Sequence, residues 1–183
     1  MGLSIAVIVG SLRAESYNRR LAEAMISVPS GADHEFRFVE IGDLPLYDQD
    51  DDKDQAPTVR RMKDEINAAD AVIFVTPEFN RSLSGVLKNA IDHGSRPYGK
   101  SCWLGKPAGV AGTSPGQSGS AMAQQHLRNI LSSVQMPTLQ GNELYIVWKP
   151  ELVDDDGKAA GDFGTFLDNW MMVFTAFVER NRA

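Results

Sequence analysis

The sequence is poor in cysteine, in long apolar runs and in clustered positive charge, and each shortage excludes a class of protein. The single cysteine, Cys102, cannot form a disulfide within the chain and has no Cys or His neighbour at metal-ligand spacing. The longest apolar runs are only of strand length, so neither a transmembrane span nor a signal segment is expected. Lys and Arg are scattered, and the formal net charge of -6 argues against broad nucleic-acid binding. We therefore expect a cytoplasmic protein whose partners are small molecules or copies of itself.

Three functional patterns are incomplete. Gly10 stands alone after the first apolar run, so the G-x-G-x-x-G fingerprint of a dinucleotide-binding fold is absent. The acidic run 48–54 lacks the central glycine and terminal glutamate of a calcium loop and is expected to be a solvated surface segment. His34, His93 and His126 are far apart in the sequence, and we expect them to be structural. No metal site is predicted.

Apolar runs of strand length alternate with helical patterns, which is typical of a parallel sheet covered on both faces. The hydrophobic fraction of 43% over 183 residues is enough for one core, and we expect a single domain over residues 1–183. The predicted fold class is α/β: a doubly wound five-stranded parallel sheet, order 2-1-3-4-5, with ligands beyond the carboxyl ends of its first, third and fourth strands. The expected strands are Ile5–Val9, Glu35–Ile41, Ala71–Thr76, Ala108–Gly112 and Leu144–Val147.

Three sets of apolar residues recur at helical spacing between or after these strands. The last set is the widest stripe, and we expect it to close one side of the sheet with its aromatic residues in the core. The sets are Val59, Met62, Ile66 and Ala69; Ala123, Leu127, Ile130, Leu131 and Val134; and Phe163, Phe166, Leu167, Trp170, Met171, Phe174, Phe177 and Val178.

The most informative segment joins the first strand to the first helix. After the buried strand, Gly10 allows a sharp turn, and helical spacing begins at Tyr17. Hydroxyls, one guanidinium and the free N–H groups of a helix N-terminus therefore converge, which is the chemistry that a phosphate monoester needs. An ordinary turn whose Ser and Asn residues cap the helix explains the loop equally well. The side chains concerned are Ser11, Arg13, Ser16, Tyr17 and Asn18.

Two further polar loops follow the third and fourth strands, TPEFNRS at 76–82 and GTSPGQSG at 112–119. Pro77 restricts the backbone on both of its sides, so the amides of the residues after it are presented stiffly along one edge of a ligand. A flat heterocycle with carbonyls and ring nitrogens suits such an edge. Taken alone, the first of these loops is more typical of a solvent loop in which Ser82 or Ser84 caps a helix, and the convergence of three loops on one crevice favours a ligand site.

Two motif matches point to other classes of enzyme. Residues 94–101, GSRPYGKS, satisfy the P-loop pattern, but they follow a helical segment instead of a strand. Residues 112–116, GTSPG, satisfy G-x-S-x-G, but Pro115 lacks the N–H that an oxyanion hole needs after the serine. The last histidine, His126, also precedes every downstream aspartate, against the order of a hydrolase triad. We expect neither an NTPase nor a hydrolase.

The three loops together resemble the NAD(P)H-dependent FMN reductase family, close to its bacterial quinone and chromate reductase branch. The resemblance is strongest in segments 10–18, 76–92 and 112–119, and it extends over essentially the whole chain. It implies a flavodoxin-like, FMN-binding domain. In such a domain Ser11, Arg13, Ser16, Tyr17 and Asn18 hold the FMN phosphate. The flavin ring rests against Pro77, Glu78, Phe79 and Asn80, and Ser114 closes the site. Family members often have Tyr where this chain has Phe79.

The resemblance also implies an activity: NAD(P)H reduces FMN, and a quinone then takes two electrons at the same face in a ping-pong cycle. Chromate, azo compounds and free flavin are further possible acceptors, and no side chain is assigned as acid or base. A non-catalytic FMN-binding electron carrier or redox sensor is the alternative. The resemblance implies a homodimer or homotetramer, and Arg96, Tyr98 and Trp103 are of types enriched at interfaces. The choice between NADPH and NADH is left open.

Overall fold

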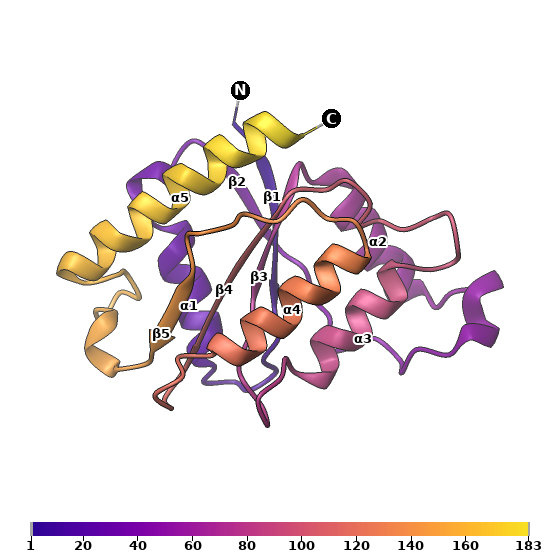
Figure 1. Ribbon diagram of the computed structural model, residues 1–183, viewed down its shortest axis with the longest axis horizontal. Coiled ribbons are helices and arrows are strands. Elements are labelled where there is room, and N and C mark those ends of the chain that lie inside the picture. Colours follow the sequence, from indigo (N-terminus) through magenta and orange to yellow (C-terminus); the bar gives the residue numbers. More distant parts are fainter. Residues whose placement is uncertain (1, 183) are drawn as a thin grey trace.

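The protein is described by a computed structural model over residues 2–182, and its centre is a five-stranded parallel sheet (Figure 1). The strands pair in the predicted order β2-β1-β3-β4-β5. Because all five run in the same direction, the loops after β1, β3 and β4 meet at one edge, at the bottom of Figure 1. The strands are β1 Ser4–Val9, β2 Glu35–Phe38, β3 Ala71–Val75, β4 Ala108–Ser114 and β5 Leu144–Val147.

Four of the five strands differ in length from the prediction. β1 begins one residue earlier, at Ser4, β3 ends one residue earlier, at Val75, and β2 and β4 differ by more. β2 ends at Phe38 instead of Ile41. The backbone N–H of the next residue, Val39, still donates to the carbonyl of Val7 in β1, and the chain then leaves the sheet. Val39 and Ile41 are buried although they lie outside the strand, and their hydrophobicity is what suggested a longer strand. β4 continues to Ser114, which pairs with Val147 of β5.

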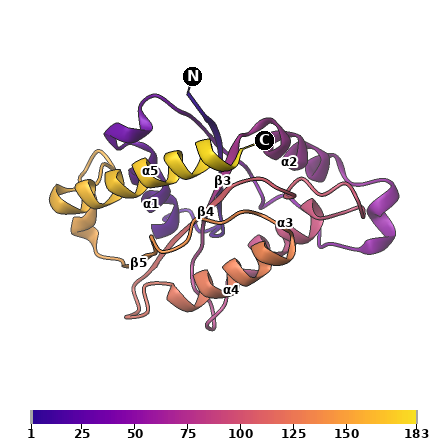
Figure 2. The same cartoon turned by 45° about the horizontal axis from the view of Figure 1, so that its top comes forward.

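Helices cover both faces of the sheet, as predicted (Figures 1 and 2). α1 and α5 pack on one face, and α2, α3 and α4 pack on the other. Within residues 2–182, no helix combines the length and the apolar character needed to cross a membrane. The helices are α1 Tyr17–Ile26, α2 Pro57–Ala68, α3 Gly85–Gly94, α4 Ala121–Ser133 and α5 Gly161–Asn181, with single 3₁₀ turns η1 Pro29–Gly31, η2 Gln49–Lys53 and η3 Pro150–Leu152.

Side chains of the central strands alternate between two cores. In β1, Ile5 and Val7 face α1 and α5, whereas Ala6 and Ile8 face the other three helices. The apolar stripe of α5 is narrower than predicted, because Phe166 lies on its flank and is 47% exposed. The buried positions of α5 are Leu167, Trp170, Met171, Phe174 and Val178.

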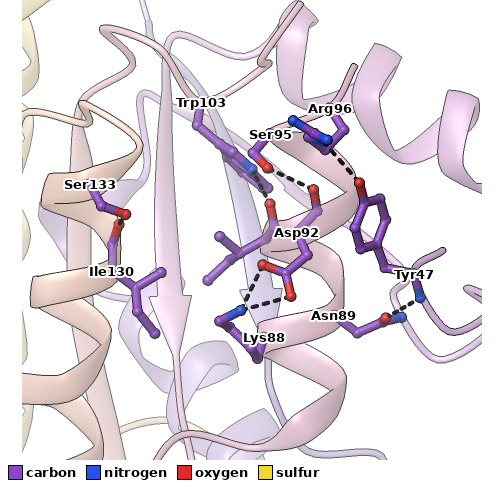
Figure 3. Close-up of polar contacts among 10 residues, drawn as sticks. Tyr47, Lys88, Asn89, Asp92, Ser95, Arg96, Trp103, Ile130 and Ser133 are labelled. Carbon is purple, nitrogen blue, oxygen red and sulfur yellow. Dashed lines mark hydrogen bonds and ion pairs between the residues drawn. The ribbon is translucent and has the colours of Figure 1, made fainter. Parts of the chain in front are cut away.

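The segment between β2 and α2 forms a strap that projects at the right of Figure 1 and is tied to α3. Asn89 accepts a hydrogen bond from the backbone N–H of Tyr47, and the Arg96 guanidinium donates to the Tyr47 hydroxyl at 2.9 Å (Figure 3). Arg96 also forms an ion pair with Asp52 at 3.2 Å. The rest of the acidic run 48–54 is largely exposed.

Trp103 does not lie at an interface, as its residue type suggested, but in the core of its own chain. Its side chain is fully buried and donates a hydrogen bond from Nε1 to the carbonyl of Ile91 at 2.9 Å (Figure 3). The ring packs directly on Gly94, where a Cβ atom would lie 2.4 Å from it. Tyr98 is 92% exposed.

We predict that Gly94→Ala lowers the free energy of unfolding by about 2 kcal/mol, because the new methyl group overpacks the Trp103 ring. Urea unfolding monitored by tryptophan fluorescence measures this change. Gly85→Ala is the matched control in the same helix, since no heavy atom lies within 4 Å of its added Cβ. Equal stability of the two variants would contradict the prediction.

Candidate functional site

The loops after β1, β3 and β4 enclose a cavity of about 250 Å³ at the carboxyl edge of the sheet. Nine of the ten residues singled out from the sequence line it, and Asn80 does not. The lining residues are Ser11, Arg13, Ser16, Tyr17, Asn18, Pro77, Glu78, Phe79, Thr113, Ser114 and Pro115.

The first loop ends in a helix N-terminus that faces the cavity. Ser16 is the N-cap of α1: its Oγ accepts the N–H of Arg19 at 3.1 Å, and its hydroxyl hydrogen remains to donate. Gly10 is required before this loop, because a Cβ there would lie 3.0 Å from Ser84 Oγ and 3.1 Å from Pro77 Cδ. The close approach of the first and second loops therefore depends on the absence of a side chain at this position.

Asn18 has a structural role that the sequence did not reveal. Its Nδ2 donates to the carbonyl of Thr113 and its Oδ1 accepts the N–H of Thr113, both at 3.0 Å, and the side chain is buried. These two bonds attach α1 to the end of β4. Nδ2 has a second hydrogen, so Asn18 can still donate into the cavity.

Aromatic stacking supports one wall of the cavity. Tyr17 lies against Trp148, which follows β5, with ring centroids 5.1 Å apart and an interplanar angle of 16°. The Arg13 guanidinium carbon lies 5.0 Å from the centre of the Tyr17 ring. Trp148 is buried, and its backbone N–H donates to the carbonyl of Ser114. Its contribution could not be inferred from the sequence, because no pattern links it to the first loop.

The second loop forms a tight hairpin at the mouth of the cavity. Phe79 and Ser82 exchange both backbone hydrogen bonds, and the two residues between them, Asn80 and Arg81, have φ angles of 52° and 65°. Two central residues with positive φ are the requirement of a type I′ turn. This places Asn80 at the tip of the turn, away from the cavity lining, and leaves the Phe79 ring 55% exposed at the rim.

The groups needed for nucleophilic catalysis are not brought together. Ser114 Oγ donates to the carbonyl of Gly116 at 3.3 Å, and His126 is paired through Nδ1 with Ser82 Oγ at 2.8 Å. Cys102 is buried away from the cavity lining, and burial raises the pKa of its thiol to about 12, so it is protonated at neutral pH. The P-loop-like segment 94–101 starts at the last residue of α3, without a preceding strand.

Comparison with known proteins gives the family. Residues 3–149 match a family model described as NADPH-dependent FMN reductase. The chain belongs to this family. A quinone reductase of Pseudomonas putida is 47% identical over 182 residues, which are 98% of this chain and 97% of that protein. A 2-hydroxy-1,4-benzoquinone reductase of a Burkholderia species is 44% identical over 183 residues, the full length of both.

Comparison with a solved structure tests the predicted fold. FerB of Paracoccus denitrificans, a flavoenzyme NAD(P)H:(acceptor) oxidoreductase, is 41% identical and superposes with a TM-score of 0.94 over 99% of this chain and 100% of that one. The flavodoxin-like fold predicted for this FMN reductase is therefore confirmed. The family makes the chain an oxidoreductase with FMN as its cofactor and NAD(P)H as its donor.

Glu78 of this FMN reductase joins two of the three loops. Its carboxylate accepts hydrogen bonds from Ser118 Oγ at 2.9 Å and from the N–H groups of Met122 and Ala123 at 3.0 and 3.3 Å. The N-cap of α4, Ser120, makes no side-chain cap of its own, so Glu78 supplies the negative charge at this helix N-terminus. The carboxylate thus holds the backbone of the second loop against the third.

We predict that Glu78→Ala lowers the free energy of unfolding by about 2 kcal/mol, because three donors lose a charged acceptor. Glu78→Gln retains one acceptor oxygen without the charge, so its free energy of unfolding should fall by about half as much. Urea unfolding of the flavin-free protein measures both changes. Glu151→Ala, at an exposed carboxylate of η3, is the control. Wild-type stability of Glu78→Ala would show that the three hydrogen bonds of this carboxylate, here called the Glu78 clamp, do not contribute to the free energy of unfolding.

Proposed function

We propose that this chain is an FMN-dependent NAD(P)H:quinone oxidoreductase in which residues 1–183 act as one FMN-binding domain. The observation that carries the proposal is the cavity where a helix N-terminus, an exposed guanidinium and a flat apolar rim meet. The quinone reductases of Pseudomonas putida and Burkholderia, which are similar over nearly the whole chain, support a quinone as the acceptor.

The first loop has the donors that a phosphate monoester requires. The hydroxyls of Ser11 and Ser16 and the guanidinium of Arg13 would bind phosphate oxygens together with N–H groups of the first turn of α1. Tyr17 and Asn18 complete this group: Tyr17 forms the wall stacked on Trp148, and Asn18 has one amide hydrogen left for the ligand. The residues present therefore fit the phosphate end of FMN.

The second and third loops fit the ring end. Pro77 and Phe79 present apolar surface to a planar group, and the clamp through Glu78 holds the backbone amides of this loop in place. Asn80, at the tip of the turn, would act through the turn geometry or through its backbone. Ser114 closes the cavity from the side of β4.

When bound, FMN supplies the hydride acceptance from NAD(P)H and the two-electron transfer to the acceptor. The protein orients the reactants and leaves one rim open, at the half-exposed Phe79. One open rim supports a ping-pong order in which donor and acceptor take turns. It also sets few limits on acceptor shape, so chromate, azo compounds and free flavin are further candidate acceptors.

We also infer a homodimer or homotetramer. Phe79 at the rim and Met122 in the first turn of α4 are 55% and 42% exposed, although both are large and apolar. An interface there would cover apolar surface next to the cavity mouth. Light scattering during size-exclusion chromatography measures the assembly, and a monomer at micromolar concentration would contradict it.

We predict that Arg13→Gln raises the Kd for FMN about tenfold and leaves the Kd for riboflavin unchanged, because riboflavin has no phosphate. Quenching of flavin fluorescence on titration of the flavin-free protein measures both constants. Arg37→Gln removes an exposed guanidinium of β2 outside the cavity lining and is the control. An equal loss of affinity for both flavins would place Arg13 away from the phosphate.

The proposed activity is tested by visible absorption of the FMN-loaded, desalted protein under anaerobic conditions. Addition of NADH or NADPH should bleach the flavin bands, and a benzoquinone should then restore them. The alternative, an electron carrier or redox sensor, predicts bound flavin that neither nucleotide reduces. If the flavin bleaches but the quinone does not reoxidise it, the quinone is not the acceptor, and reduction of the flavin by NAD(P)H still stands.

A further inference from the structure

A second cavity, of about 240 Å³, lies on the other side of the first loop, between the carboxyl ends of β1 and β2. It shares Ser11 and Arg13 with the candidate flavin cavity, so one loop separates the two. A volume below the usual range of about 300–1,000 Å³ for small-molecule pockets suits one part of a ligand that extends beyond it. The remaining lining residues are Val9, Leu12, Arg19, Phe38, Val39, Glu40 and Ile41.

Arg19 forms a flat, charged surface in this cavity. Its guanidinium carbon lies 3.6 Å from the centre of the Phe38 ring, and its Nε donates to Glu23 at 2.6 Å. These contacts hold one face of the guanidinium on the ring, and 45% of the side chain remains exposed. A guanidinium plane held in this way stacks well on an aromatic heterocycle such as a purine.

Glu40 lies just beyond β2 and has a free acceptor. Its Oε1 accepts the N–H of Gly42 at 2.6 Å, and this bond orients the carboxylate. In Rossmann sheets, which differ from this one in strand order and in their Gly-rich first loop, an acidic residue after the strand next to β1 hydrogen-bonds the ribose 2′-hydroxyl. The same carboxylate repels a 2′-phosphate. Glu40 therefore has the position and the chemistry to recognise a ribose diol.

We propose that this second cavity binds the adenosine half of the nicotinamide nucleotide, with the purine against Arg19 and the ribose diol at Glu40. The inference rests on the proposed function, since it assigns a place to the donor of that reaction. The nucleotide then passes over the first loop beside Ser11 and Arg13, which line both cavities, and its nicotinamide reaches the flavin at the open rim. Because Glu40 disfavours a 2′-phosphate, NADH is the preferred donor.

The binding test uses ADP-ribose and 2′-phospho-ADP-ribose, which keep the adenosine half and lack the nicotinamide. Calorimetry on the oxidised, FMN-loaded protein should give tighter binding of ADP-ribose. Glu40→Gln should narrow the ratio of the two Kd values about tenfold, because the repulsive charge is removed. Glu35→Gln, an exposed carboxylate at the start of the same strand, should leave the ratio unchanged. An unchanged ratio in Glu40→Gln would overturn the assignment of Glu40.

Arg19→Leu tests the purine contact separately. It should weaken ADP-ribose binding about tenfold and leave the Kd for FMN at the wild-type value. In steady-state assays its KM for NADH should rise with little change in kcat, because the contact is made equally in the ground and transition states. Wild-type ADP-ribose affinity in this variant would overturn the subsite.

The flavin bleaching experiment separates the two levels of the proposal. If NADH reduces the bound flavin but ADP-ribose binds the wild-type and Arg19→Leu proteins equally, the subsite is wrong and the reductase function stands. If neither NADH nor NADPH reduces the bound flavin, the proposed reductase function is wrong, and so is the adenosine subsite that rests on it.

Discussion

The paired hydrogen bonds between Asn18 and the backbone of Thr113 are the contact on which the rest of the site depends. They are buried and join residues 95 positions apart, so they hold the N-terminus of α1 at the end of β4. Parallel pairing brings three loops to one edge of the sheet, but it does not set the distance between them. This amide does so for the first and third loops. A buried pair of this kind is costly to break, because two buried backbone groups then lose a hydrogen-bond partner.

Glu78 has the corresponding role between the second and third loops. Its carboxylate reaches from the end of β3 to the N-terminus of α4, where it replaces a missing helix cap. Asn18 and Glu78, which are expected to contact the ligand, thus also hold the protein around the cavity. The candidate flavin cavity is therefore preorganised, and little ordering of loops has to accompany ligand binding. In the proposed function the other ligand contacts come from the first loop, from Pro77 and Phe79, and from Ser114.

The first loop has two sides, and both can serve one reaction. Its inner side faces the flavin cavity, and its outer side faces the cavity at the end of β2. Arg13 lines both, so the loop that would hold the FMN phosphate also borders the path of the donor. In this proposal the nicotinamide reaches the flavin at the rim beside Phe79, and the acceptor takes its place there after the oxidised nucleotide has left. Donor choice and acceptor choice are then set by different residues.

By itself the sequence determined the α/β class, the strand order and nine of the residues that line the cavity, because these follow from buried strand patterns and from loops at strand ends. Only the tertiary structure decided what those residues do. Asn18 and Trp103 pair with backbone groups, and Glu78 accepts two backbone N–H groups besides the Ser118 hydroxyl. No sequence pattern marks a backbone group as a partner. Asn80 lies at the tip of its turn because two successive residues have positive φ angles. The second cavity arises where the ends of β1 and β2 pack together. Long-range contacts of this kind arise from the path of the chain in space, which periodicity does not encode.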